Sequence, residues 1–447
     1  GASYFFYGWW DWRFLALIAI STLVDFISGQ KIFEANSEGR LKVAKRWLWL
    51  SLAINLGMLG YFKYANFFIA SWIDSWAVFG IIMEESSLQI ILPIGISFYT
   101  FQTLSYTLDI YRRQLAPTKN FINFAAFVSF FPQLVAGPIE RASSLLPQIQ
   151  TARVFDKREA VSGLRLIIWG MFKKVAIADT CAIYVNGVYA DYGSCAGATL
   201  LMGMIFFALQ IYCDFSGYSD IAIGTARLFG IKLKTNFDTP FFSKSLPEFW
   251  NRWHISLNTW MNDYVFMPLA FALRKYKRLG LIVSVILTFS LSGLWHGADW
   301  KFVIYGGIHG FAFLPYLLKS SGPVRLFSRH NRRIGSGALN AKDWLSVSYT
   351  MVVVLVSFVF FRAESLADAL NYLSNLRSNG DNKFGKSAII MPIVVLGLDW
   401  IVKRSGEEGP FSQFSYFFQS LWFGLFVFLI LLCGFSYPAH QFIYFQF

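Results

Sequence analysis

Charged residues are scarce in this chain. Of its 447 residues only 15% are Asp, Glu, Lys or Arg, whereas 55% are hydrophobic and 19% are aromatic. A soluble domain normally carries about a quarter charged residues because its surface must be solvated. Long apolar runs fill the deficit from end to end, which excludes a string of soluble domains. We predict a single membrane domain over residues 1–447, whose solvent is the lipid bilayer.

Several chemical motifs are also missing. The four cysteines have no CxxC spacing, so neither a disulfide framework nor a metal site is indicated. The sequence has no GxxxxGK[ST] loop for a nucleotide, no HExxH for zinc and no GxSxG elbow. The net charge of +13 comes from Lys and Arg in short loops between apolar runs. That pattern is typical of cytoplasmic loops of membrane proteins, so no nucleic-acid partner is predicted.

About ten apolar segments approach the ~20 residues that a helix needs to cross a bilayer. The sequence therefore predicts an all-α, polytopic membrane protein. The segments are Phe14–Ser28, Leu48–Trp72, Leu88–Asp109, Leu166–Tyr184, Thr199–Gly230, Gly280–Trp295, Phe302–Leu318, Trp344–Phe361, Ala388–Val402 and Phe414–Gly434.

A further apolar stretch, Phe121–Gly137, has basic segments on both sides. A full span cannot begin and end on the same side of the membrane, and Pro132 and Pro138 break helices. We expect a re-entrant segment, which is tolerated at membrane depth only where it is buried or lines a cavity.

Polar residues interrupt a second apolar run, between Asp214 and Asp220. Two interpretations stay open: a broken helix lining a cavity, or a short loop between two helices. A third segment, Pro247–Tyr264, has tryptophans at helical spacing, and His254, Asn258 and Asn262 follow each other at i, i+4 and i+8. It predicts one helix with an apolar stripe and a polar ridge, which lies at the membrane interface or plugs a cavity from the cytoplasmic side.

Histidine is the natural base for taking a hydroxyl proton near neutral pH. His296 ends an apolar run and has the small neighbours Gly293 and Gly297, which we expect to leave room for a substrate. An ionisable group there is costly and usually faces a cavity or a partner. A packed histidine is the alternative, and the same holds for His254. We expect helix packing for His309, and solvent exposure for the other two histidines, His330 and His440.

Together these residues resemble the membrane-bound O-acyltransferase family, in its bacterial polysaccharide-modifying branch that includes alginate O-acetylation proteins. The matching segments occur in the family's order and cover most of the chain from Tyr4 to about Gly310. They are LPIGISFY at 92–99, FPQLVAGP at 131–138, DFSGYSD at 214–220, FWNRWHISL at 249–257 and SGLWHG at 292–297.

The resemblance implies a ring of tilted helices around a central funnel, with His296 as the catalytic base and His254 as a second catalytic histidine. It implies a cytoplasmic acyl thioester such as acetyl-CoA as the donor substrate, with no bound cofactor, and an exported or cell-envelope polysaccharide as the acceptor. A periplasmic or membrane-anchored acyltransferase partner and the bacterial inner (cytoplasmic) membrane are implied as well. The candidate substrate-binding residues are Asn258, Asn251, Trp295, Asp214, Ser216 and Tyr218.

Two departures qualify the match. Alginate-type members are expected to carry a Gly-Gly-Asn-Arg stretch soon after the Asp263-Tyr264 pair, and this chain does not. The match also begins inside a family motif at Ala2, so we expect a further span before it. D-alanyl transfer to teichoic acid stays open within the family. Outside it, a transporter or flippase and a non-catalytic export scaffold are the alternatives, although no pair of interrupted segments in matching halves favours a transporter.

Overall fold

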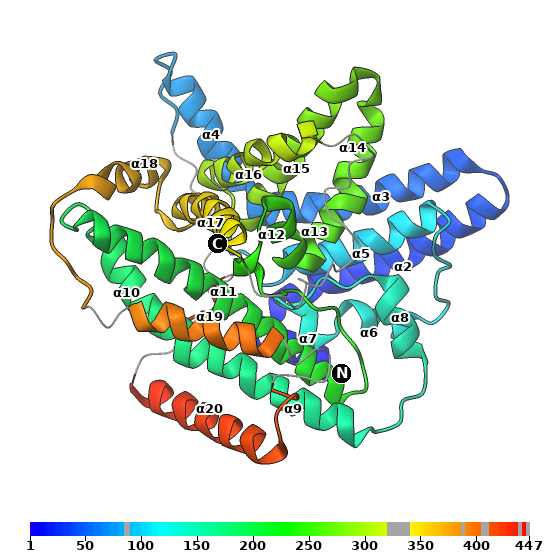
Figure 1. Ribbon diagram of the computed structural model, residues 1–447. Helices are drawn as coiled ribbons and strands as arrows, with labels where there is room; N and C mark the ends of the chain where they lie inside the picture. Colours follow the sequence, from blue (N-terminus) through cyan, green and yellow to red (C-terminus); the bar gives the residue numbers. More distant parts are fainter. Residues whose placement is uncertain (85–89, 320–339, 386–388, 404–410, 437–439, 444–447) are drawn as a thin grey trace. The chain divides into compact units, whose positions relative to one another are not determined.

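The computed structural model describes residues 1–84, 90–319, 340–385, 389–403, 411–436 and 440–443 (Figure 1). In these ranges the chain forms helices and one isolated bridge, between Cys195 and Asp381, and no sheet. The all-α prediction is confirmed. The chain divides into two compact units, one of residues 1–155 with 229–233 and one of residues 156–228 with 234–447. The single-domain organisation and the central funnel stay predictions.

The first unit is built on three long helices that share a buried polar centre. Asp25 on α2 is fully buried and accepts hydrogen bonds from Ser51 Oγ (2.5 Å) and Asn55 Nδ2 (2.9 Å) on α3. These donors replace the water that the carboxyl group loses on burial. The helices of this unit are α1 (Ala2–Trp10), η1 (Trp12–Phe14), α2 (Leu15–Ser37), α3 (Leu41–Leu59), the π-helix η2 (Gly60–Tyr64), α4 (Ala65–Ala77), α5 (Ile96–Tyr111), α6 (Phe121–Val128), α7 (Phe131–Leu134) and α8 (Ala142–Gln150).

The segment Phe121–Gly137 is broken, as its prolines predict. Asn120 caps α6 by accepting from the Asn123 N–H, the helix stops at Val128, and Pro132 lies in the first turn of α7. Proline has no N–H and is tolerated in the first turn of a helix, where that N–H has no partner within the helix. The interrupted helix is confirmed, whereas its return to the same side of a membrane stays a prediction.

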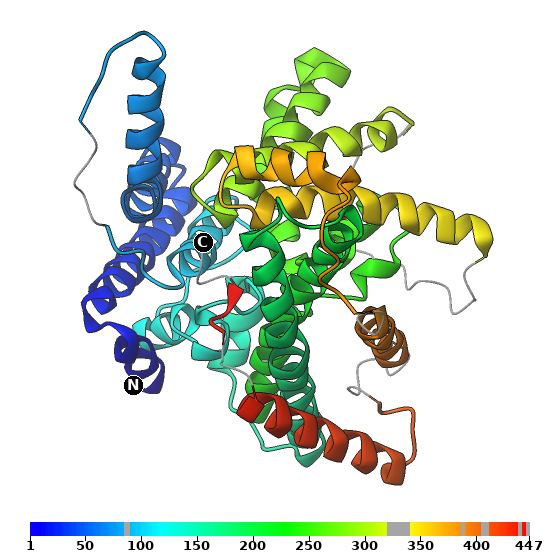
Figure 2. The same cartoon turned by 90° about the vertical axis from the view of Figure 1, so that its left-hand side faces the viewer.

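The second unit carries the remaining helices, and Figure 2 shows its last helix, α20, alongside α9. They are α9 (Lys157–Met171), the π-helix η3 (Phe172–Ala178), α10 (Asp179–Ala190), α11 (Gly197–Leu228), η4 (Pro240–Phe242), α12 (Leu246–Arg252), α13 (Ile255–Met261), the π-helix η5 (Asn262–Phe266), α14 (Met267–Ala272), η6 (Arg274–Tyr276), α15 (Lys277–His296), α16 (Trp300–Lys319), α17 (Ala341–Arg362), α18 (Leu366–Ser374), η7 (Asn375–Arg377), α19 (Ile390–Lys403) and α20 (Tyr416–Ser436).

Helix α11 is continuous over 32 residues, so both interpretations of Asp214–Asp220 as an interruption are wrong. Gly217 does not break the helix. A Cβ added there would lie 2.7 Å from the Gly170 carbonyl oxygen on α9, and one added to Gly170 would lie 2.5 Å from that of Gly217. The two glycines let the backbones of α9 and α11 touch, and the two helices lie side by side in Figure 1.

This contact gives a prediction for Gly217→Ala. Backbone on the facing helix cannot move aside cheaply, so we expect a loss of about 1–3 kcal/mol of stability. Gly187→Ala is the matched control: it lies on α10 with nothing within 4 Å of the added carbon, and should stabilise by about 0.5–1 kcal/mol. Thermal denaturation of the purified protein in detergent measures both. Equal midpoints for the two variants would contradict the packing role of Gly217.

Six described helical segments are long and apolar enough to cross a membrane by length and composition. The other predicted spans fall on shorter helices or on helices joined through π turns, such as α9–η3–α10. Most of each predicted segment is helical, but Leu88–Asp109 is helical only from Ile96, and Leu88, Gln89 and Ala388 lie outside the described residues. The number of crossings stays a prediction. The six are Trp12–Ser37, Gly197–Leu228, Arg274–His296, Trp300–Leu318, Ala341–Arg362 and Tyr416–Phe435.

Candidate active site

The site begins at an elbow between α12 and α13. Ser245 caps α12 by accepting from the Glu248 N–H, and the helix ends at Arg252. His254 then adopts a left-handed conformation, with φ 45° and ψ 51°, immediately before α13. This conformation costs a non-glycine residue roughly 1–2 kcal/mol and often marks a functional position. The surrounding contacts must hold it in place.

The elbow overturns the prediction of one helix over Pro247–Tyr264. The i, i+4, i+8 ridge does not exist as such, because His254 precedes α13, Asn258 lies within it and Asn262 begins the π turn η5. Asn258 instead donates to the carbonyl oxygens of Trp250 (2.6 Å) and Trp253 (2.5 Å). Its amide satisfies carbonyl groups left over at the end of α12.

A short extended segment before α12 clamps the elbow. The Ile255 N–H donates to the Asn236 carbonyl oxygen and the Asp238 N–H donates to that of Arg252, both at 2.9 Å. The Arg252 guanidinium is buried and pairs with Glu248 (3.1 Å) and Asp238 (3.3 Å). Both ends of the elbow are thus tied to one segment, which fixes where His254 points.

His254 is fully buried in an aromatic surround. Its ring meets Phe215 of α11 edge-on, with centroids 4.6 Å apart, and stacks on Phe237 at 6.4 Å. Its Nδ1 lies 3.2 Å from the Asn236 side-chain oxygen. Burial, and secondly the neighbouring His296, lower the pKa of His254 well below its usual 6.5. The imidazole is therefore neutral at physiological pH.

His296 is the last residue of α15 and is 4% exposed. Aromatic rings surround it: the centroids of Trp295, Phe361 and Tyr305 lie 5.0, 5.4 and 6.1 Å away. The two small neighbours do not provide the predicted room, because Phe302 fills the space over them. A Cβ on Gly293 or Gly297 would lie 2.0 Å from Phe302 of α16, so those glycines serve helix packing.

The structure brings the two predicted catalytic histidines together. Their ring centroids lie 6.1 Å apart, although they come from the elbow and from the end of α15. Trp295 lies against both, 5.8 Å from His254 and 5.0 Å from His296, and Asn251 is a half-buried residue of α12. Two imidazoles with little contact with water form a site where a proton can be moved under weak dielectric screening.

The three candidates on α11 lie in a different environment. Asp214 pairs with Lys174 at 2.7 Å and accepts from the Ile443 N–H at 2.5 Å. The hydroxyl of Ser216 accepts from Lys173 at 2.9 Å, and Tyr218 packs edge-on against Phe442 at 4.9 Å. Their contacts are with η3 and the C-terminal segment, so substrate binding by them stays a prediction.

Lys173 and Lys174 are buried charged residues that were not among the candidates from the sequence. Lys174 lies between Asp214 and Asp179 (2.8 Å) and donates to the His440 carbonyl oxygen at 2.9 Å. Lys173 pairs with Asp220 at 2.5 Å. Two consecutive lysines inside an apolar run are costly in a membrane and could have flagged this cluster.

The predictions for the other three histidines differ in their outcome. His309 is buried on α16, with its Nε2 2.8 Å from Ser357 Oγ, which confirms a packing position. His440 is half-buried against the Lys174 cluster, so its predicted solvent exposure is wrong. His330 lies outside the described residues.

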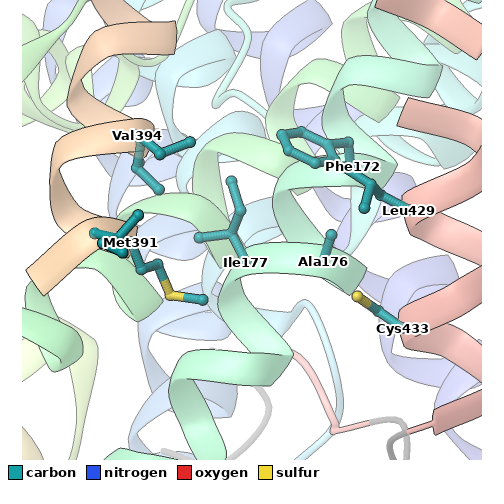
Figure 3. Close-up of a pocket in the computed structure, with 9 residues that line it drawn as sticks. Phe172, Ala176, Ile177, Met391, Val394, Leu429 and Cys433 are labelled. Atoms are coloured by element: carbon teal, nitrogen blue, oxygen red, sulfur yellow. The ribbon is translucent and has the colours of Figure 1, made fainter. Parts of the chain in front are cut away.

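An apolar cleft of about 390 Å³ opens elsewhere in this unit, between η3, α19 and α20 (Figure 3). Its lining residues are apolar apart from the thiol of Cys433, and none of them is a general base, so the cleft is not suited to proton transfer. The lining residues are Phe172, Ala176, Ile177, Ile390, Met391, Val394, Val395, Leu429 and Cys433.

Comparison with known families shows to which family the chain belongs. The model of the membrane-bound O-acyltransferase family matches residues 111–360, a range that holds the elbow, His254 and His296. The chain belongs to this family. As a membrane-bound O-acyltransferase it is a multi-pass membrane enzyme that uses an acyl donor.

Three relatives in this family are informative. A probable alginate O-acetylase AlgI of Pseudomonas putida is 39% identical over 85% of this chain and 74% of its own length. A peptidoglycan O-acetyltransferase of Helicobacter pylori is 32% identical over 84% and 72%. A teichoic acid D-alanyltransferase of Streptococcus thermophilus is more distant, 27% identical over 60% and 68%. The first two cover more of this membrane-bound O-acyltransferase than the third.

Proposed function

We propose that this chain moves an acetyl group from a cytoplasmic thioester, such as acetyl-CoA, to hydroxyl groups of an exported or cell-envelope polysaccharide. The observation that carries the proposal is the pair of buried histidines 6.1 Å apart, at the positions that the family resemblance assigns to catalysis. The relatives named for alginate and peptidoglycan O-acetylation support an acetyl group and a glycan acceptor.

In this reaction His296 accepts the proton of the acceptor hydroxyl, on the glycan or on an intermediate carrier, while that oxygen attacks the thioester carbonyl. The tetrahedral intermediate then expels the thiolate, which takes the proton back from His296 and leaves as the free thiol. The products are an ester and a thiol, so atoms and protons balance. A positioned base of this kind contributes about 10²–10⁴-fold to the rate. His254 assists from the second position, and Trp295 and Asn251 line the site.

The proposal places the enzyme in the bacterial inner membrane, where a cytoplasmic donor and an exported acceptor can meet at one protein. It also includes a periplasmic or membrane-anchored acyltransferase partner that completes transfer to the polymer. D-alanyl transfer to teichoic acid is the second candidate, favoured by the more distant relative named for that activity.

Mild base releases both acyl groups from envelope and secreted glycans, so one experiment separates the candidates. We expect a deletion strain to lose ester-linked acetate and the wild-type gene to restore it, with ester-linked D-alanine unchanged. Loss and return of D-alanine instead would favour the second candidate. Equal amounts of both in every strain would contradict acyl transfer to glycans.

A further inference from the structure

Asn236 makes an unusually complete set of contacts around the elbow. It is 1% exposed, and its side-chain oxygen lies within hydrogen-bonding distance of three groups: the Ser256 N–H (3.2 Å), the Ser256 hydroxyl (2.9 Å) and His254 Nδ1 (3.2 Å). Its amide nitrogen donates to Ser219 Oγ at 3.2 Å on α11. Asn236 lies outside the motifs that the sequence analysis identified.

These contacts fix which end of the amide is oxygen. A backbone N–H can only donate, so the atom facing Ser256 N must be an acceptor, and the amide nitrogen must face Ser219. A flipped side chain would set two donors against each other. The same oxygen faces His254 Nδ1, and two acceptors cannot share a hydrogen bond, so Nδ1 carries the proton.

We propose that Asn236 is a positioning residue that holds His254 as the Nδ1–H tautomer, so that Nε2 is the nitrogen that accepts a proton in the active site. A neutral imidazole has one donor and one acceptor nitrogen. With the donor committed to Asn236, Nε2 of His254 offers an acceptor lone pair to the site and does not donate to a developing oxyanion. The tautomer follows from the geometry alone, whereas its part in catalysis rests on the proposed function.

The backbone of Asn236 supports the same assignment. Its carbonyl oxygen accepts from the Ile255 N–H at 2.9 Å, directly after the left-handed His254. Main chain and side chain of Asn236 therefore hold His254 together with the two residues that follow it, Ile255 and Ser256. An asparagine that orients a catalytic histidine is also found in the Cys-His-Asn triads of cysteine proteases on other folds.

The tautomer can be measured without an activity assay. The purified full-length enzyme in detergent, labelled with ¹⁵N-histidine, gives the His254 signals by difference from His254→Ala. Couplings to the ring protons tell Nδ1 from Nε2. We expect a protonated Nδ1 and an unprotonated Nε2 near neutral pH. A proton on Nε2 of the wild-type enzyme would overturn the proposal whatever its catalytic activity.

Kinetics then test whether the tautomer matters. Asn236→Leu removes the acceptor and should lower kcat by about 10²-fold with KM little changed. Ser256→Ala is the matched control, because it removes a neighbouring hydrogen bond to the same oxygen and leaves the bond to His254. We expect kcat of the control to stay within about 3-fold of the wild-type value, because Ser256→Ala removes one neutral hydrogen bond that takes no part in the reaction.

Asn236→Asp tests the direction through pH. A carboxylate accepts the same Nδ1 proton but favours the imidazolium, so the His254 pKa should rise by about 1–3 units. His254 must be neutral for Nε2 to act as an acceptor. The acid limb of the pH–activity profile should therefore shift to higher pH than in the wild type. The titratable group that lies against its ring in the described chain is His296 on α15, whereas Phe215, Phe237 and Ser219 are uncharged.

The outcomes separate this inference from the proposed function. If His296→Ala is inactive while Asn236→Leu keeps the wild-type kcat and pH profile, the positioning role is wrong and the acyltransferase proposal stands. If Asn236→Leu and Ser256→Ala lose activity equally and in proportion to folded protein, Asn236 is merely structural. A measured Nδ1–H tautomer together with unchanged glycan acetate would uphold the geometry and refute the proposed function.

Discussion

Replacing His296 with alanine is expected to lower the rate of acyl transfer by about 10²–10⁴-fold, the usual contribution of a positioned general base. The side chain is 4% exposed and meets Trp295, Tyr305 and Phe361. With so little of the side chain exposed, bulk water is a poor substitute for the lost imidazole. The measurement is thioester-dependent acetylation of a glycan acceptor by the purified enzyme with its partner, per folded molecule.

His440→Ala is the matched control for this variant. His440 is half-buried and reaches the Lys174 cluster through its main-chain carbonyl, which the substitution keeps. Its activity should equal that of the wild type. If His296→Ala retained full activity at equal expression, the base would have to be another residue, and the assignment carried by the resemblance would be wrong.

The largest loss of stability is expected from Lys174→Met. The Lys174 side chain is 10% exposed, and its ammonium group lies between Asp214 and Asp179, whose side chains are 4% and 8% exposed. Removing the cation leaves two carboxylates buried close together without it, and breaking a buried ion pair in this way costs about 3–5 kcal/mol. The C-terminal segment should loosen as well, because the His440 carbonyl oxygen loses its donor.

Thermal denaturation in detergent, together with limited proteolysis of the C-terminus, measures this effect. Lys383→Ala is the control, since its ion pair with Asp191 lies at the surface, with side-chain exposures of 33% and 60%. Exposed pairs contribute little, so its midpoint should stay at the wild-type value. Equal midpoints for both variants would mean that the cluster is compensated by water or by a shifted proton.

Composition and periodicity in the sequence by themselves determined the class of protein. The shortage of charge and the recurrence of apolar runs require a helical membrane protein, because only such segments satisfy their own backbone in lipid. The break before Pro132 also followed from local chemistry. The candidate histidines were identified by residue type, and their roles by resemblance to a family, which the match over residues 111–360 bears out at the level of the family.

Only the tertiary structure decided what depends on distant partners. Asp214 and Gly217 look like a helix break locally, yet Lys174 neutralises the first and Gly170 packs against the second, some forty residues earlier in the chain. The helical spacing through His254 is locally sound, yet Asn236 draws the chain into an elbow there. Sequence periodicity reflects the local conformational preferences of neighbouring residues. Whether a buried charge or a strained backbone is stable depends on groups that come close only when the chain folds.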